Sequence, residues 1–148
     1  MQLQMEKQDL KLDKDCIFCK IVKGDIPCSK IFEDDYVISF LDIAPANKGH
    51  ALIVTKNHYK TLLDVPDQDL NDLMLKAKKI ARAMSSALGI DGFNILMNNK
   101  KVAGQLVPHT HLHIIPRFNG DGINLNWRPN KYNAKEIDEF KEKIKSFL

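Results

Sequence analysis

The sequence predicts one α+β domain, with an antiparallel sheet of about five strands and two main helices. Three observations predict this class: a β-hairpin pattern in the first third of the chain, one long amphipathic helix in the middle, and two further strand patterns after that helix. At 148 residues with 44% hydrophobic content, the chain is long enough for one compact core and short for two.

The N-terminal part of the chain changes character at residue 16. Residues 1–15 carry Lys, Asp, Glu and Gln with little apolar periodicity, which predicts a mobile extension ahead of a single domain over residues 16–148. Apolar residues at helical spacing over residues 16–22, followed by Gly24, predict a short helix.

The expected strands are short apolar runs bounded by turn residues. They span residues 30–33, 36–41, 49–55, 93–98 and 108–116. The first two flank the turn residues Asp34 and Asp35 and predict a hairpin. The last two are separated by a short polar loop, so we expect them to be antiparallel neighbours.

Two amphipathic helices complete the predicted fold. Between Pro66, which suits a first helical turn, and Gly89, which suits a helix end, the sequence carries an apolar stripe at helical spacing. The stripe consists of Leu70, Leu73, Met74, Ala77, Ile80, Ala81, Met84 and Leu88. A second stripe predicts a last helix after residue 133, and its members are Ile137, Phe140, Ile144 and Phe147.

Charge and cysteine usage exclude several classes of protein. The formal net charge of +3 is spread along the chain, which argues against a nucleic-acid or membrane partner. No segment is apolar enough to span a bilayer, and the polar N-terminus predicts a cytoplasmic protein. Three cysteines, two of them as Cys16-x-x-Cys19, fit a metal or redox pair better than a disulfide framework, and leave Cys28 as a free thiol.

Three histidines, His109, His111 and His113, recur at every second position between two prolines. In a β-strand alternate side chains point to opposite faces, so all three line one face. The run is rich in β-branched residues and ends at Pro116, which favours a strand over a helix. Burying three imidazoles side by side is costly unless something binds or reacts there. We therefore predict a functional site on this face rather than a purely structural cluster.

The histidine run is one of several motifs that resemble the histidine triad (HIT) family, whose signature is His-x-His-x-His with hydrophobic x. The resemblance extends from Cys16 to about Trp127. In chain order the motifs are Cys16-Ile17-Phe18-Cys19, Gly24-Asp25-Ile26-Pro27, Phe40-Leu41-Asp42-Ile43, Gly49-His50-Ala51-Leu52-Ile53-Val54, Ala103-Gly104-Gln105 and His109 to His113. The branch most closely resembled is the Hint or protein-kinase-C-interacting-protein-like one, in its bacterial-type zinc-carrying form.

The resemblance implies a HIT-like fold and hydrolysis of nucleotides at the α-phosphate, most of all of purine nucleoside phosphoramidates. His111 would attack the α-phosphorus and form a nucleotidyl-histidine that water releases. His50, Asn98, Gln105 and His113, with backbone N–H groups of Gly104 and Gln105, would stabilise the phosphate, and His113 would also protonate the leaving group. The nucleoside would lie between Phe18, Ile21, Phe40 and Ile43, with Asp42 accepting the ribose hydroxyls. Core packing is an equally good account of those four apolar residues.

The resemblance also supplies ligands for a metal. A Cys-x-x-Cys pair alone gives two ligands, and zinc in a structural site takes four. In zinc-carrying members the other two correspond to His58 and His109, so the implied cofactor is a structural zinc bound by Cys16, Cys19, His58 and His109. The resembled fold pairs its sheets across a two-fold axis, so we expect a homodimer.

The sequence departs from the family pattern at three positions. Leu106 stands where members commonly carry Ser or Thr, so a hydroxyl that protonates an amine leaving group is absent. Lys100 stands where many members have Gly, and Lys100 and Lys101 either reach extra phosphates of a longer polyphosphate substrate or form a solvated charged loop. Pro108 replaces a bulky residue ahead of His109.

The sequence leaves other functions open. Within the same enzyme class the alternative is a dinucleoside polyphosphate hydrolase. Outside that class there are two alternatives. One is a nucleotide-binding regulatory protein with vestigial catalysis, and the other is a metalloenzyme that uses all three triad histidines as ligands. For the Cys16-x-x-Cys19 pair, a redox function is the alternative to zinc.

Overall fold

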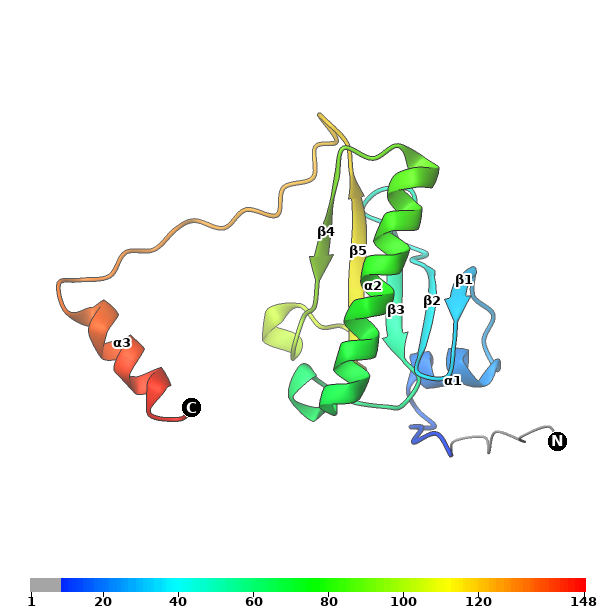
Figure 1. The fold of residues 1–148 in the computed structure, drawn as a ribbon, viewed down its shortest axis with the longest axis horizontal. Helices are drawn as coiled ribbons and strands as arrows, with labels where there is room; N and C mark the ends of the chain where they lie inside the picture. Colours follow the sequence, from blue (N-terminus) through cyan, green and yellow to red (C-terminus); the bar gives the residue numbers. More distant parts are fainter. Residues whose placement is uncertain (1–8) are drawn as a thin grey trace.

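The fold is a five-stranded antiparallel sheet, and the computed structural model describes it over residues 9–148 (Figure 1). The strand order across the sheet is β1-β2-β3-β5-β4. The strands are β1 (Lys30–Glu33), β2 (Val37–Leu41), β3 (Ala51–Thr55), β4 (Gly92–Leu96) and β5 (His111–Arg117). The helices are α1 (Ile17–Lys23), α2 (Asp67–Leu88) and α3 (Glu136–Lys145), with single 3₁₀ turns η1 (Leu62–Asp64) and η2 (Lys101–Ala103). The predicted α+β class and the antiparallel sheet are confirmed.

The sheet separates two hydrophobic clusters because successive strand residues face opposite sides. On one face α2 lies along the sheet (Figure 1), and its buried side chains Leu73, Ala77 and Ile80 pack on Ile53 and Ile114. On the other face the short helix α1 covers a second cluster. That cluster contains Cys16, Phe18, Cys19, Ile38, Phe40, Leu52 and Val54. The histidine side chains of β5 therefore face α1.

Strand β5 lies between β3 and β4, so His111 and His113 are on an interior strand of the sheet with a neighbour on each side. His111 pairs with Val54 and His113 with Leu52 of β3, in antiparallel register. The predicted antiparallel pairing of β4 with β5 is also confirmed.

The expected end of this strand at Pro116 is wrong, because β5 continues to Arg117. Pro116 pairs with Phe93 of β4, whereas the pairing with β3 ends two residues earlier, at Ile114. Pro116 has no N–H to donate, and this costs no strand hydrogen bond on the β3 side, because β3 does not extend as far as Pro116. On that side the carbonyl of Pro116 accepts a hydrogen bond from Asn47 Nδ2 at 2.9 Å.

The two helices that pack on the sheet end at glycines in the left-handed conformation. Gly24 follows α1 and Gly89 follows α2, with φ of 87° and 58°. Both were expected as helix ends. The sequence places Pro66 in the first turn of α2. In the structure Pro66 is the N-cap residue, and the helix begins at the next residue, Asp67.

The last helix, α3, forms where its apolar periodicity predicts, but its apolar face is not covered. An extended segment carries α3 away from the sheet (Figure 1), and Trp127 in that segment is exposed. The stripe residues Ile137, Phe140, Ile144 and Phe147 are all exposed. The core of the described chain is thus complete without α3.

The predicted N-terminal extension is only partly described, since residues 1–8 lie outside the described residues. Residues 9–15 run beside the segment that follows β3: Lys11 N–H donates to Asn57 Oδ1, and His58 N–H donates to the Lys11 carbonyl. The division at residue 16 remains a prediction. Between residues 9 and 148, no helix combines the length and apolar composition needed to cross a membrane.

Candidate active site and metal-binding group

The candidate active site lies on the α1 face of the sheet, around His111 of β5. The His111 side chain is buried, and the edge of the Phe18 ring contacts it with ring centroids 5.0 Å apart. The His113 ring lies next to His111, at 5.0 Å between centroids. The every-second spacing of the sequence therefore does place these imidazoles together.

One hydrogen bond fixes the tautomer of His111. Its Nδ1 lies 2.6 Å from the carbonyl oxygen of His109. A carbonyl only accepts, so Nδ1 carries the proton and donates it. Nε2 of neutral His111 then carries the lone pair. Burial lowers the pKa of His111, which keeps the ring neutral near physiological pH and this lone pair available as a nucleophile.

A second chain of hydrogen bonds orients His113. The backbone N–H of Ala46 donates to Nδ1 of His50 at 3.0 Å, so the His50 proton is on Nε2. That Nε2 lies 3.0 Å from Nδ1 of His113 and donates to it. His113 is consequently protonated on Nε2 and presents an N–H. Burial, together with repulsion from His111 and His50, lowers the pKa of His113 to about 4.

Asp42 provides the carboxylate of this cluster. Its Oδ2 lies 3.7 Å from Nε2 of His50, and its Oδ1 accepts a hydrogen bond from Ala44 N–H. Burial lowers the pKa of His50 and the nearby Asp42 charge partly offsets that effect. The cluster is therefore a set of neutral imidazoles beside one carboxylate.

The first triad histidine belongs to a different group. His109 is fully buried, and its Nδ1 faces the sulfur atoms of Cys16 and Cys19 at 3.3 and 3.5 Å. His58 completes the group with Nδ1 at 3.3 Å from the Cys19 sulfur. The four ligand atoms lie within 4.8 Å of one another. This group can hold one metal ion, with a ligand set of two thiolates and two imidazoles.

The geometry of this Cys₂His₂ group fits tetrahedral zinc. With zinc–sulfur and zinc–nitrogen bonds of about 2.3 and 2.0 Å, tetrahedral geometry puts sulfur and nitrogen ligands about 3.5 Å apart. The measured separations of 3.3 to 3.5 Å agree with that value. Nε2 of His109 donates to the Thr55 carbonyl at 2.7 Å, which leaves Nδ1 unprotonated, as a metal ligand must be. Without a cation, burial raises the pKa of Cys19 to about 11 and disfavours its thiolate.

The triad histidines are thus divided between two groups. Among residues 9–148, candidate metal ligands gather as the Cys16, Cys19, His58, His109 group and as Asp42, His50, His113. His111 belongs to neither. A single metal bound by all three triad histidines is therefore not the arrangement that this fold presents.

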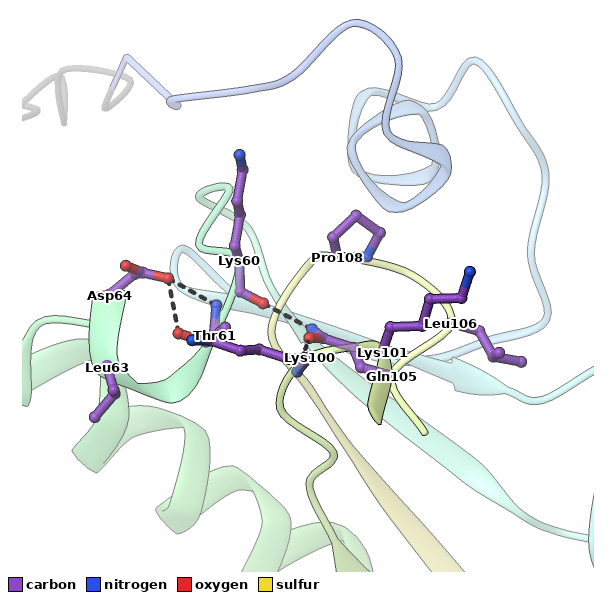
Figure 2. Close-up of a pocket in the computed structure, with 9 residues that line it drawn as sticks. All are labelled: Lys60, Thr61, Leu63, Asp64, Lys100, Lys101, Gln105, Leu106 and Pro108. Atoms are coloured by element: carbon purple, nitrogen blue, oxygen red, sulfur yellow. Dashed lines mark hydrogen bonds between the residues drawn. The ribbon is translucent and has the colours of Figure 1, made fainter. Parts of the chain in front are cut away.

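Two predicted phosphate ligands, Gln105 and Asn98, form hydrogen bonds to backbone groups in and beside the loop before β5. The Gln105 side chain is buried in the loop before β5 (Figure 2), where Nε2 donates to the Lys60 carbonyl and Oε1 accepts from Lys100 N–H, each at 2.7 Å. Asn98 Nδ2 lies 3.5 Å from the Gly104 carbonyl in the same loop. The backbone N–H groups of Gly104 and Gln105 also have partners within the loop.

The predicted nucleoside contacts differ in exposure. Phe18 and Phe40 are buried and pack edge to face, with centroids 5.8 Å apart. Ile21 is half-buried against the same cluster, whereas Ile43 is fully exposed. The core-packing account therefore applies to both phenylalanines, and Ile43 has a free surface.

Sequence reasoning missed the backbone groups that fix the imidazoles. The Thr55 carbonyl orients His109, and the Ala46 N–H sets the His50 tautomer. Both are backbone groups, so the residue types in the sequence do not reveal them. It also missed the pocket next to Gln105, whose walls come from two loops far apart in the chain, at residues 60–64 and 100–108 (Figure 2).

The fold and the site together define an α+β protein with a buried histidine cluster beside a Cys₂His₂ metal-binding group. The family model described as HIT domain matches residues 23–120. The adenosine 5′-monophosphoramidase of Schizosaccharomyces pombe is 42% identical over 132 residues, which cover 88% of this chain and 96% of the relative. The chain therefore belongs to the HIT family.

Solved structures agree with this assignment. A HIT family protein of Bacillus subtilis superimposes with a TM-score of 0.86 at 38% identity, covering 91% of this chain and 98% of the other. A zinc-bound histidine triad protein of Mycobacterium smegmatis superimposes with a TM-score of 0.72 at 40% identity, covering 78% and 84% of the two chains.

The low pKa of His113 predicts acid sensitivity. A histidine near pKa 4 in the folded state and 6.5 in the unfolded state binds its proton more readily when the chain is unfolded. Its contribution is complete above about pH 6.5 and is lost as the pH falls toward 4. We expect His113→Gln to reduce the loss of unfolding free energy between pH 7 and pH 5 by on the order of 1 kcal/mol. Urea denaturation at both pH values measures this, and equal losses in variant and wild type would contradict it.

Proposed function

We propose that this HIT protein is a nucleotide hydrolase that acts at the α-phosphate of purine nucleoside phosphoramidates through a covalent His111 intermediate. The observation that carries the proposal is the 2.6 Å hydrogen bond from His111 Nδ1 to the His109 carbonyl, which leaves Nε2 as a buried, neutral nucleophile. The adenosine 5′-monophosphoramidase among the relatives supports the choice of substrate class.

The first chemical step forms a bond from His111 Nε2 to the α-phosphorus and breaks the phosphorus–nitrogen bond. The departing nitrogen keeps the bonding electron pair and takes one proton, so that it leaves as a neutral amine. This proton comes from water, because a neutral imidazole does not give up its ring proton. Nε2–H of His113, oriented by the hydrogen bond with His50, is placed to donate a hydrogen bond to the departing group.

The second step releases the nucleotide. The oxygen of a water molecule bonds to phosphorus, the phosphorus–nitrogen bond to His111 breaks, and the electron pair returns to Nε2. The proton that this water molecule loses balances the proton that the amine took up in the first step. Dividing the displacement into two steps lowers each barrier, and phosphoryl transfer of this kind depends mainly on positioning and charge stabilisation.

The nucleoside is proposed to lie at the α1 side of the histidine cluster. Asp42 is the candidate acceptor for the ribose hydroxyls, because its carboxylate is next to His50. Ile21 and Ile43 offer accessible apolar surface for a base, and Ile21 packs against the cluster that contains Phe18 and Phe40. Gln105 and Asn98 hold the loop before β5, and their contribution to the phosphate site is through that loop.

We further propose that the metal is one zinc ion, bound by Cys16, Cys19, His58 and His109. Four protein ligands leave no open position, so zinc would stabilise the fold and not activate water. The zinc-bound mycobacterial HIT structure supports this assignment. The homodimer and the cytoplasmic location remain predictions from the sequence.

A direct test is the intact mass of the protein after rapid acid-free quenching from adenosine 5′-phosphoramidate. We expect an adduct of one adenosine monophosphate on the wild type and none on His111→Ala, because Nε2 of His111 is the proposed nucleophile. His111→Ala should lower kcat/KM by roughly 10⁴-fold or more while nucleotide binding persists. An active His111→Ala enzyme would contradict the proposed function.

Metal removal is expected to destabilise the fold. At free zinc roughly 1,000 times Kd, binding adds about 4 kcal/mol to the free energy of unfolding, and Cys19→Ser should lose most of this stabilisation. The matched control is Cys28→Ser, since Cys28 lies outside the Cys₂His₂ group. Thermal unfolding with and without a chelator measures the effect. A chelator response as large in Cys19→Ser as in the wild type would contradict the assignment.

A further inference from the structure

One imidazole of the Cys₂His₂ group has an unpaired ring nitrogen. A histidine that binds a metal through Nδ1 carries its proton on Nε2, and that N–H is almost always donated to a carboxylate, a backbone carbonyl or water. Nε2–H of His109 is donated to the Thr55 carbonyl. Nε2 of His58 is buried and has no hydrogen-bond partner among residues 9–148. The four ligands therefore leave one buried donor, on His58, in need of an acceptor.

The side chain of Asp13 is next to this nitrogen. Among the described residues it offers the one carboxylate within 4 Å of His58 Nε2, and the distance from its Oδ2 is 3.9 Å. A hydrogen bond between these atoms would measure about 2.9 Å, so a shift of about 1 Å makes it. The Asp13 side chain is 43% exposed and the His58 side chain only 12%. The carboxylate therefore has room to move toward the buried ring.

Asp13 contacts the metal-binding group a second time, through its backbone. Its N–H donates to the sulfur of Cys19 at 3.3 Å. An N–H directed at this sulfur stabilises the negative charge that the sulfur carries as a metal ligand. One residue thus contacts two of the four ligands, Cys19 through the main chain and His58 through the side chain.

Hydrogen bonds on both sides of Asp13 fix its position. Before it, the Lys11 carbonyl accepts from the backbone N–H of His58 at 2.7 Å. After it, Asp15 N–H donates to Asp13 Oδ1 at 2.8 Å, and Cys16 N–H donates to the Asp13 carbonyl at 3.2 Å. The turn occupies Oδ1 and leaves Oδ2 on the side of His58. The segment before α1 is therefore shaped to bring this carboxylate to the metal-binding group.

We propose that Asp13 is a positioning residue of the metal-binding group, whose carboxylate accepts a hydrogen bond from Nε2–H of His58 when Nδ1 binds the metal. This bond fixes the tautomer and orientation of the His58 ring and makes Nδ1 a stronger ligand. The inference rests on the proposed zinc assignment and extends it. Asp13 precedes Cys16, the first residue of the motifs that resemble the family.

The test is the zinc affinity of Asp13→Asn, measured at neutral pH by competition with a chromophoric chelator. Asparagine keeps an oxygen for the Asp15 N–H, but it places an NH₂ donor opposite the Nε2–H donor of His58. The backbone N–H that points to Cys19 is unchanged. We expect the Kd for zinc to rise about tenfold or more, because removing the outer partner of a metal-binding histidine typically costs this much affinity.

The matched control is Asp15→Asn, which removes the same charge two residues further along the chain. Asp15 is exposed and lies outside the Cys₂His₂ group. Its carboxylate acts on the metal only through solvent-screened electrostatics, so we expect the Kd for zinc to stay within about threefold of the wild type. The comparison separates the specific contact of Asp13 from a general effect of negative charge near a cation.

A second measurement does not depend on how well the variant folds. In the zinc-loaded wild type, ¹H–¹⁵N spectra of the histidine rings should show Nε2–H of His58 as a downfield proton in slow exchange with water, because a carboxylate accepts it. Asp13→Asn should move this proton upfield.

Three results would overturn the assignment of Asp13: an unchanged zinc affinity in Asp13→Asn, an equal loss in Asp13→Asn and Asp15→Asn, or a His58 Nε2–H that exchanges rapidly with water in the wild type. A wild type that binds no zinc would instead overturn the zinc assignment itself. The nucleotide adduct on His111 tests the proposed catalysis separately from both.

Discussion

The site depends on the position of one residue, His109, which holds the metal-binding group and the nucleophile at the same time. Its ring is fully buried, with Nε2–H bonded to the Thr55 carbonyl and Nδ1 facing the two cysteine sulfurs. Its carbonyl accepts the proton of His111 Nδ1. The same backbone position thus connects α1 to the sheet and selects the reactive nitrogen of His111.

The imidazoles are kept neutral by burial and directed by the backbone. Burial, together with repulsion from neighbouring histidines, lowers the pKa of His109 and His113 to about 4, and protonating either would bury a charge. Backbone groups then decide which nitrogen carries the proton in His50, His109 and His111. The chemistry of the site follows from these hydrogen bonds as much as from the residue types.

Much of the fold and part of the site could be predicted from local pattern. The stripe containing Leu73, Ala77 and Ile80 predicts α2, and the alternation of His109, His111 and His113 predicts their shared face, because both signals depend only on spacing along one element. Gly24 and Gly89 mark helix ends for the same reason.

The remaining features depend on residues far apart in the chain. The orientation of Gln105 is set by the Lys60 carbonyl, 45 residues away, and the continuation of β5 past Pro116 depends on where β3 begins. The apolar stripe of α3 predicts a helix correctly but carries no information about what covers it. No local pattern records such pairings.

The most direct measurement of the central claim is the tautomer of His111, read from the ¹⁵N chemical shifts of its ring in the zinc-loaded protein at neutral pH. A carbonyl acceptor at 2.6 Å requires the proton on Nδ1, so we expect a protonated Nδ1 and an unprotonated Nε2. A proton on Nε2, or on both nitrogens, would remove the nucleophilic lone pair and contradict the account.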